Sequence, residues 1–291
     1  MAGQLKEVRN RIKSVQNTQQ ITKAMKMVSA AKLRKAQEGI VQMRPYAKKL
    51  QEVLGNIVSE GSQATNLSVE RPIEKVLLVV ITSDRGLCGA YNANIIKLAK
   101  TAIREKYSTQ AAKGNVTLWT IGKKGYEHFI KNKFKTDATF KDVFLSLSFE
   151  NVQAVSQAAI KAYENKEFDH VDLVYSEFRN AATQRFVLEQ FLPIPKTEKK
   201  TGAKNIDFIF EPSREELVKE LMPKILNTQL YKAVLDANAS EHGARMTAMD
   251  KATENANELL KSLKISYNRA RQASITTELT EIVSGAAALQ G

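Results

Sequence analysis

Residues 4–44 decide the fold of this chain, and they read QLKEVRNRIKSVQNTQQITKAMKMVSAAKLRKAQEGIVQMR. The run holds no proline and one glycine, Gly39, so little within it interrupts a helix. Its first apolar residues are spaced by three and four, as in a helix that packs on another helix: Leu5, Val8, Ile12 and Val15. About forty residues at 1.5 Å each predict a helix on the order of 60 Å long.

The same stripe is predicted to continue in a less regular register through Ile21, Met25, Val28 and Leu33. Small residues around it would let a neighbouring helix approach closely. Pro45, followed by Gly55 and Gly61, is expected to mark the fading end of this helix.

A second helical stretch lies towards the C-terminus. Ser213 is predicted to cap a helix, with Glu216 three residues later. No glycine or proline lies between Gly243 and Gly285, which again predicts roughly 60 Å of helix. Two apolar stripes follow each other here: Leu260, Leu263, Tyr267 and Ala270, then Ile275, Leu279 and Ile282.

Between the two helical stretches the pattern changes to alternating strands and helices. Residues 75–82 are an apolar, β-branched run typical of a buried parallel strand. Further strands are predicted at 115–121 and 170–175, with an antiparallel edge strand at 185–191, and helices at 92–107, 122–130 and 151–163. This alternation predicts a small, Rossmann-like α/β domain.

The fold class is therefore α/β, with a long antiparallel coiled coil of N- and C-terminal helices beside the α/β domain. Helices this long cannot bury a face inside so small a domain, so their natural partner is each other. The expected boundaries are 1–60 for the first helix, 70–195 for the α/β domain and 210–291 for the second helix, the two helices packing as one unit.

Charge distinguishes this chain more than composition does. Its 43% hydrophobic and 26% charged residues are ordinary for a globular protein, but the net charge is +13. Twelve basic and two acidic residues within 1–50 account for ten of those charges. An acidic partner is expected to meet the N-terminal helix.

Targeting and membrane signals are not expected. The start of the sequence has no apolar signal-peptide core, and no stretch reaches the roughly 20 apolar residues that span a bilayer. Cys88 is the one cysteine, which fits a reducing compartment. Any membrane attachment would then go through other proteins.

No catalytic, cofactor or metal site is expected. Residues 122–125, GKKG, lack the spacing and the hydroxyl of a phosphate-binding loop and suggest a turn that opens a helix. Cys88 follows a strand within Asp84-Arg85-Gly86-Leu87-Cys88-Gly89, yet nothing indicates a nearby histidine base, so a small buried thiol is the better interpretation. The three histidines and the cysteine show no metal-ligand spacing.

Non-specific binding of nucleic acid is the alternative for so basic a chain, because a basic helix can hold phosphates without reading bases. That function predicts basic residues interleaved with aromatic ones, or a recognisable reading module. The twelve basic residues of the N-terminal stretch stand beside a single aromatic residue, Tyr46.

Three motifs resemble those of F-type ATP synthase gamma subunits. They are RIKSVQNTQQITKAMKMV at 11–28, TSDRGLCGAYN at 82–92 and ARQASITTELTEIVSGAAA at 270–288. The resemblance covers the whole chain in order, and motifs of this length are highly specific.

The resemblance implies a central rotor shaft that couples ion-driven rotation of the membrane c ring to ATP synthesis or hydrolysis on the beta subunits. It implies a subunit with no nucleotide site and no cofactor, partnered by the alpha and beta subunits of the catalytic hexamer, the epsilon subunit and the c-subunit ring. It also places the chain peripherally at the cytoplasmic face of a bacterial inner membrane. Chloroplast-type members carry a regulatory cysteine pair, which Cys88 alone cannot form.

Site residues follow from the resemblance as well. Contacts with the beta subunits are implied at Met25, Lys26, Arg271 and Gln272. An apolar bearing tip is implied at Ile275, Leu279 and Ile282. The foot towards the c ring and epsilon subunit is implied at Arg44, Tyr46, Asp207, Phe210 and Glu211.

Overall fold

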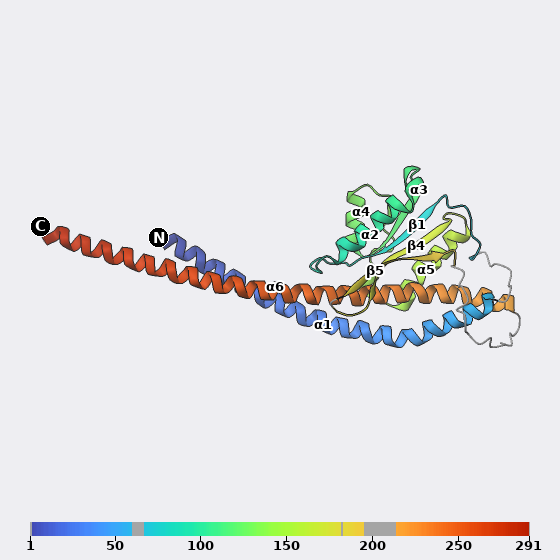
Figure 1. The fold of residues 1–291 in the computed structure, drawn as a ribbon, viewed down its shortest axis with the longest axis horizontal. Coiled ribbons are helices and arrows are strands. Elements are labelled where there is room, and N and C mark those ends of the chain that lie inside the picture. The colour runs from blue at the N-terminus through green and yellow to red at the C-terminus, as the bar shows by residue number, and fades with distance from the viewer. Residues whose placement is uncertain (1, 60–66, 182, 195–213, 291) are drawn as a thin grey trace. The chain divides into compact units, whose positions relative to one another are not determined.

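A computed structural model describes residues 2–59, 67–181, 183–194 and 214–290 (Figure 1). Two long helices enclose the rest of the sequence, α1 at Ala2–Ser59 and α6 at Arg214–Gln290. Between them lie β1 Val76–Ile81, α2 Tyr91–Glu105, α3 Ser108–Ala112, β2 Val116–Ile121, α4 Lys123–Lys131, β3 Thr136–Asp137, η1 Val143–Ser146, α5 Phe149–Glu164, β4 His170–Phe178 and β5 Gln184–Leu192. The predicted fold class, long terminal helices plus an α/β part, is confirmed.

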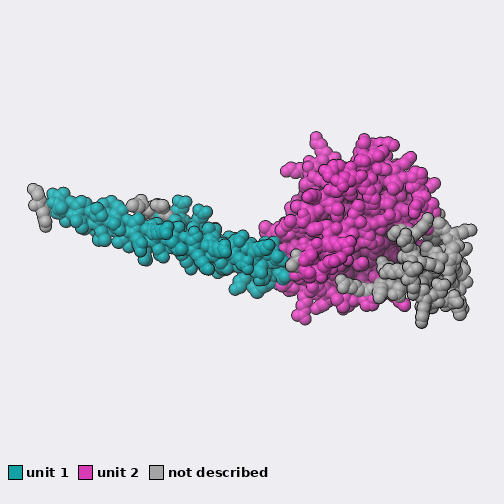
Figure 2. Space-filling view, viewed as in Figure 1, with its two compact units in different colours: residues 1–29, 246–291 teal, residues 30–245 magenta. Residues whose placement is uncertain are grey.

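The chain forms two compact units, which Figure 2 distinguishes by colour. The helical unit consists of residues 1–29 and 246–291, the outer parts of α1 and α6. The body unit consists of residues 30–245, which include the sheet, its helices and the inner parts of α1 and α6.

The body unit is built on a five-stranded sheet with the order β3-β2-β1-β4-β5. β1 pairs in parallel with β2 and with β4, and β2 pairs in parallel with β3. β5 is antiparallel to β4 and lies at the edge, as the sequence predicts. Each helix that connects two parallel strands packs on one face of this sheet.

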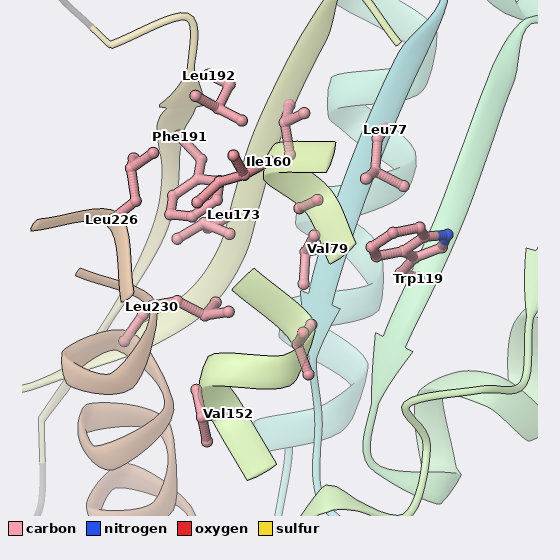
Figure 3. Packing of buried hydrophobic residues seen from close by; sticks show 14 of the residues in the cluster. Leu77, Val79, Trp119, Val152, Ile160, Leu173, Phe191, Leu192, Leu226 and Leu230 are labelled. Atoms are coloured by element: carbon pink, nitrogen blue, oxygen red, sulfur yellow. The ribbon is translucent and has the colours of Figure 1, made fainter. Parts of the chain in front are cut away.

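Both faces of the sheet are covered, because alternate residues of β1 point to opposite sides. Leu77, Val79 and Ile81 join one core cluster, which α5 and α6 complete (Figure 3). Val76, Leu78 and Val80 join the other cluster, which α2 and α4 complete. A strand buried on both faces reads as a continuous apolar run, which is why β1 is the strongest strand signal in the sequence.

Three short elements have no counterpart in the sequence analysis, namely α3, β3 and η1. β3 has only two residues, paired to Leu118 and Trp119 of β2, so no alternation pattern can form. Elements of two to five residues depend on the packing around them rather than on a local pattern.

The first helix does not fade at Pro45; it ends between Gly55 and Gly61, the later residues expected to mark its end. α1 continues through Pro45 to Ser59. Leu50, one turn beyond the proline, packs against the core cluster of the body unit. Leu50 is only partly buried, so its contact offsets part of the approximately 3 kcal/mol that an interior proline costs a helix. Packing beyond the proline therefore favours continuing the helix.

The second helix, α6, begins at Arg214, where the sequence predicts a helix start, and it runs through both Pro223 and Gly243. Ser213, the predicted cap, lies outside the described residues. Gly243 has a packing role: a Cβ there would lie 3.2 Å from the Cα and carbonyl oxygen of Ala181. This glycine allows a close approach within the body unit and does not end the helix.

The predicted stripe holds for Leu33, which is buried, and for the half-buried Met25, but it is wrong for Ile21 and Val28, which are 59% and 57% exposed. Thr22 and Ser29, one residue further on, are buried instead. The seam of α1 in the helical unit keeps an unbroken spacing of three and four residues: Leu5, Val8, Ile12, Val15, Gln19, Thr22, Lys26 and Ser29. The last four of these residues face α6 although they are polar, because the seam keeps its spacing of three and four residues.

Candidate interaction surfaces

Side-chain hydrogen bonds join α1 to α6 in the helical unit and define their register. The pairs are Arg9 with Tyr267, Gln19 with Asn257, Thr22 with Thr253 and Lys26 with Asp250. The position on α1 rises by 17 residues from Arg9 to Lys26, and its partner on α6 falls by 17. The two helices are therefore antiparallel in one register across this span.

Met25 and Lys26, the first predicted beta-subunit contacts, are both half-buried beside α6. The Lys26 Nζ lies 2.5 Å from the Asp250 Oδ1. The backbone carbonyl of Met25 accepts a 2.7 Å hydrogen bond from the Ser29 hydroxyl. Lys26 thus has an intramolecular partner that the sequence analysis missed, although the spacing of residues 5–15, extended by heptads, would have placed it in the seam.

Arg271 and Gln272 are exposed on α6, near the level where α1 begins. Tyr267 pairs with Arg9, so Ala2, seven residues earlier on α1, is level with position 274. The part of α6 beyond this level has no described residue of α1 beside it.

The predicted apolar tip lies in that part of α6. Ile275, Leu279 and Ile282 are 47%, 57% and 66% exposed, and they are not part of the seam. Ser274 and Thr277 are the half-buried residues there. Spacing of four and three residues places the three apolar side chains along one side of the helix.

The predicted foot is described only in part. Tyr46 is 54% exposed on α1 in the body unit. Asp207, Phe210 and Glu211 lie outside the described residues, and so does the side chain of Arg44.

The loop after β1 holds the motif around Cys88, and α6 anchors it. The Arg245 guanidinium donates to the carbonyl oxygens of Arg85 and Gly86 and pairs with Glu241 one turn earlier. The Tyr91 hydroxyl donates to the carbonyl of Ala237, 2.9 Å away. These contacts tie α6 to the loop within the body unit, and no local sequence pattern indicates them.

Cys88 is buried in this turn, as predicted. Its Sγ lies 3.3 Å from the Asn92 Nδ2 and 3.7 Å from the Ser83 Oγ. Burial raises the pKa of the Cys88 thiol, and the hydrogen bond with Ser83 opposes that rise only in part. None of its hydrogen-bond partners among the described residues is a histidine. The thiol is therefore a packing group that stays protonated at neutral pH.

The GKKG segment forms the turn that opens α4, as predicted. Gly122 adopts a φ of +102°, and a Cβ there would lie 2.3 Å from the carbonyl oxygen of Thr82. The backbone N–H of Gly125 donates to the Thr82 hydroxyl. Both glycines serve the contact between this turn and β1.

No metal-holding cluster of His, Cys, Asp or Glu occurs within the ranges that the structure describes. The His170 ring forms a hydrogen bond with Asp172, with 2.9 Å between the Nε2 and Oδ1 atoms. Burial lowers the pKa of His242 to about 4.

None of the helices in the described ranges combines the length and the apolar character that a membrane span requires.

Together these features define a class of protein, an antiparallel pair of long helices joined to an α/β body. A model of the ATP synthase family matches residues 4–289. The chain is 53% identical to the ATP synthase gamma chain of Cytophaga hutchinsonii over 290 residues, covering 98% of each. It is 51% identical to that of Flavobacterium johnsoniae, covering 99% of each. This chain belongs to the ATP synthase gamma chain family, as its motifs predict.

Solved structures share the fold. The rotor of the Euglena gracilis mitochondrial ATP synthase gives a TM-score of 0.66 at 19% identity and covers 94% of this chain and 100% of its own. A chain of the OSCP/F1/c-ring part of the same synthase gives a TM-score of 0.71 at 20% identity, covering 99% of this chain and 95% of its own.

Proposed function

We propose that this chain is the central-stalk rotor subunit of an F-type ATP synthase, which couples ion-driven rotation of the c ring to ATP synthesis or hydrolysis on the beta subunits. The observation that carries the proposal is the antiparallel pairing of α1 and α6 in a single register from Arg9–Tyr267 to Lys26–Asp250. A shaft that transmits torque needs two helices that cannot turn independently, and these side-chain pairs supply that link.

The basic face of α1 is the surface on which beta subunits would glide. Lys6, Arg11, Lys13 and Lys23 are all exposed in the helical unit. Exposed ion pairs are individually worth only about 0–1 kcal/mol, so a rotor held by them can move from one partner to the next. Contacts at Met25, Lys26, Arg271 and Gln272 are part of this proposal, with the Lys26 ammonium shared with Asp250.

The tip of α6 would turn in an apolar collar of the alpha and beta hexamer. Ile275, Leu279 and Ile282 are exposed in this chain, and burying them against a collar removes apolar area from water. The residues from 272 onward carry two acidic and no basic groups, so attraction to the collar would not rest on positive charge.

The foot would contact the c ring and the epsilon subunit through Arg44, Tyr46, Asp207, Phe210 and Glu211. Only the exposed ring of Tyr46 supports this assignment from the structure, and the rest follows the sequence motifs. In this role the chain would be peripheral, at the cytoplasmic face of a bacterial inner membrane, and would touch the membrane only through the complex.

Catalysis would take place on the beta subunits, and this chain would bind no nucleotide and no cofactor. An asymmetric shaft contacts each beta subunit differently and so biases their conformations differently. The nucleic-acid hypothesis is not supported, because the relatives are ATP synthase gamma chains.

Reconstitution tests the proposal directly. Co-expression with alpha and beta subunits should yield an ATPase complex with one copy of this chain, and rotation should be visible for a bead fixed to the body unit. A chain that fails to co-purify, and instead shifts a generic DNA duplex at low salt, would reject it.

A further inference from the structure

The α1 side of the seam in the helical unit changes from apolar to polar along its length. Leu5, Val8, Ile12 and Val15 occupy its first four positions on α1. Gln19, Thr22, Lys26 and Ser29 occupy the next four at the same spacing. On α6, Asn257, Thr253 and Asp250 pair with Gln19, Thr22 and Lys26, whereas the buried residues of this part of the helix, Ala256 and Met249, are apolar like Leu260 and Leu263.

Apolar side chains were available for these positions. Ile21 and Val28 precede Thr22 and Ser29 by one residue, yet they are more than half exposed. A rotation of α1 by about 100°, the angle between successive helix residues, would bury them instead. The observed seam therefore prefers paired polar groups to apolar ones that lie next to them.

The polar groups satisfy one another only in the observed register. The Thr22 and Thr253 hydroxyls are 2.8 Å apart, and Lys26 and Asp250 form an ion pair at 2.5 Å. A slip of α6 by one heptad in either direction moves Asp250 about 10 Å from Lys26 along the axis. The same slip would leave an apolar seam equally filled, since its spacing repeats every seven residues.

We propose that the polar run Gln19, Thr22 and Lys26 against Asn257, Thr253 and Asp250 is the register lock of the two helices. The apolar part of the seam supplies attraction without a preferred alignment, and the polar part selects one alignment. Polar residues at single seam positions fix register in coiled coils at a cost in stability. The inference does not depend on the rotor function, because register can be read on the full chain alone.

Disulfide trapping reads the register. Ile12 precedes Thr22 by ten residues and Leu263 follows Thr253 by ten, so a cysteine pair at 12 and 263 reports the observed alignment. Pairs Ile12→Cys with Ala256→Cys and Ile12→Cys with Ala270→Cys report slips of one heptad. All three are made with Cys88→Ala, and Trp119 fluorescence confirms that the body unit is folded.

Replacing the lock by apolar residues should loosen alignment but not association. The variant is Gln19→Leu, Thr22→Val and Lys26→Leu with Asn257→Leu, Thr253→Val and Asp250→Leu. We expect the slipped disulfides to form about tenfold more than in the parent, with a helical unit at least as heat-stable. Trapping at 12 and 263 alone in this variant would show that the apolar seam, or the packing of the inner parts of both helices in the body unit, sets the register and would overturn the proposal.

If the variant with six substitutions folds poorly, a charge swap between positions 26 and 250 gives the matched control. Lys26→Asp alone should increase the slipped products, and Lys26→Asp with Asp250→Lys should return trapping to 12 and 263. If Lys26→Asp leaves the trapping pattern unchanged, or if the swap fails to restore it, the lock is not formed by this pair.

Discussion

At the scale of single residues, the body unit depends on a buried carboxylate. Asp172 is fully buried on β4. It accepts hydrogen bonds from the Lys106 ammonium at 2.7 Å, the Tyr107 hydroxyl at 2.5 Å and the His170 ring at 2.9 Å. Burial raises the pKa of Asp172, but these hydrogen bonds outweigh it and hold the pKa below its ordinary value. The network replaces the water that a buried charge loses.

Asp172→Asn should therefore destabilise the chain by about 3 kcal/mol, because it removes one partner of a buried charge network. Urea unfolding followed by Trp119 fluorescence measures this, since Trp119 lies in the sheet core. Asp142→Asn is the control, as Asp142 pairs with Lys123 at the surface, and it should cost less than about 1 kcal/mol. Equal losses in the two variants would contradict the importance of the network.

The same carboxylate gives a pH dependence with a defined sign. Because the folded state lowers the pKa of Asp172, its stabilisation is present above the ordinary value of 3.8 and is lost as pH falls through the folded value. The stabilities of the parent chain and of Asp172→Asn should converge as pH falls below 3.8. Parallel curves down to the acid unfolding of the parent would argue against this assignment.

Gly122 gives a second prediction at this scale. Gly122→Ala should destabilise by more than about 3 kcal/mol, because the added Cβ meets the Thr82 carbonyl at a φ of +102°. Gly114→Ala is the control that measures the cost of a positive φ alone, since Gly114 has a φ of +71° with no atom near its Cβ position. It should lower the stability by about 1–2 kcal/mol. Chemical denaturation of the two variants measures the difference, and comparable losses would show that the contact with Thr82 relaxes.

At the scale of elements, the two ends of α6 serve different purposes. Its inner part is buried in the body unit, where Leu226, Leu230 and Val234 belong to the core cluster (Figure 3). Its outer part exposes Ile275, Leu279 and Ile282. One continuous helix thus has a section that stabilises the chain and a section whose apolar side chains are exposed, as the proposed bearing requires.

Replacing Ile275, Leu279 and Ile282 by serine should leave the melting temperature of the isolated chain within a few degrees of the parent, since exposed positions contribute about 0.5 kcal/mol or less each. The same variant should assemble poorly with the alpha and beta subunits, as judged by co-purification and ATPase activity. Leu260→Ser is the contrasting control, because this buried seam residue should lower the melting temperature itself. Normal assembly of the triple variant would remove the tip from the proposed bearing.

At the level of the whole molecule, the proposed function rests on coupling between this chain and its partner subunits. Met25 lies half-buried next to the proposed register lock, whereas its neighbour Met27 is 61% exposed. The two methionines therefore allow the same charge to be introduced on one helix in different surroundings.

Met25→Lys should impair ion pumping per ATP more than ATP hydrolysis, because it adds charge at a proposed torque-bearing contact. The measurement is proton pumping and hydrolysis of the reconstituted synthase in vesicles, side by side. Met27→Lys carries the same charge at an exposed position and should have a smaller effect on coupling. An unchanged pumping ratio in Met25→Lys would exclude Met25 from the torque path.

Local patterns were enough to predict the two long helices, the buried strand β1 and the antiparallel edge strand. Those elements carry strong periodic signals, and the motifs at 11–28, 82–92 and 270–288 were specific enough to predict the family. The foot residues Asp207, Phe210 and Glu211 and the proposed subunit contacts stay predictions, because they depend on chains other than this one.

Only the tertiary structure decided that the helices run through Pro45 and Gly243 and which of their sides meet. Pro45 and Gly243 look like breaks in the sequence, but Leu50 packs on the core beyond the proline, and the Ala181 backbone leaves little room for a side chain at position 243. Ile21 and Val28 look like seam residues, but Thr22 and Ser29 take that place because a coiled coil keeps its spacing even where its side chains are polar. The sequence determines the period of a helix locally. Whether the helix continues through a proline or glycine, and which of its sides is buried, depend on contacts with residues distant in the chain.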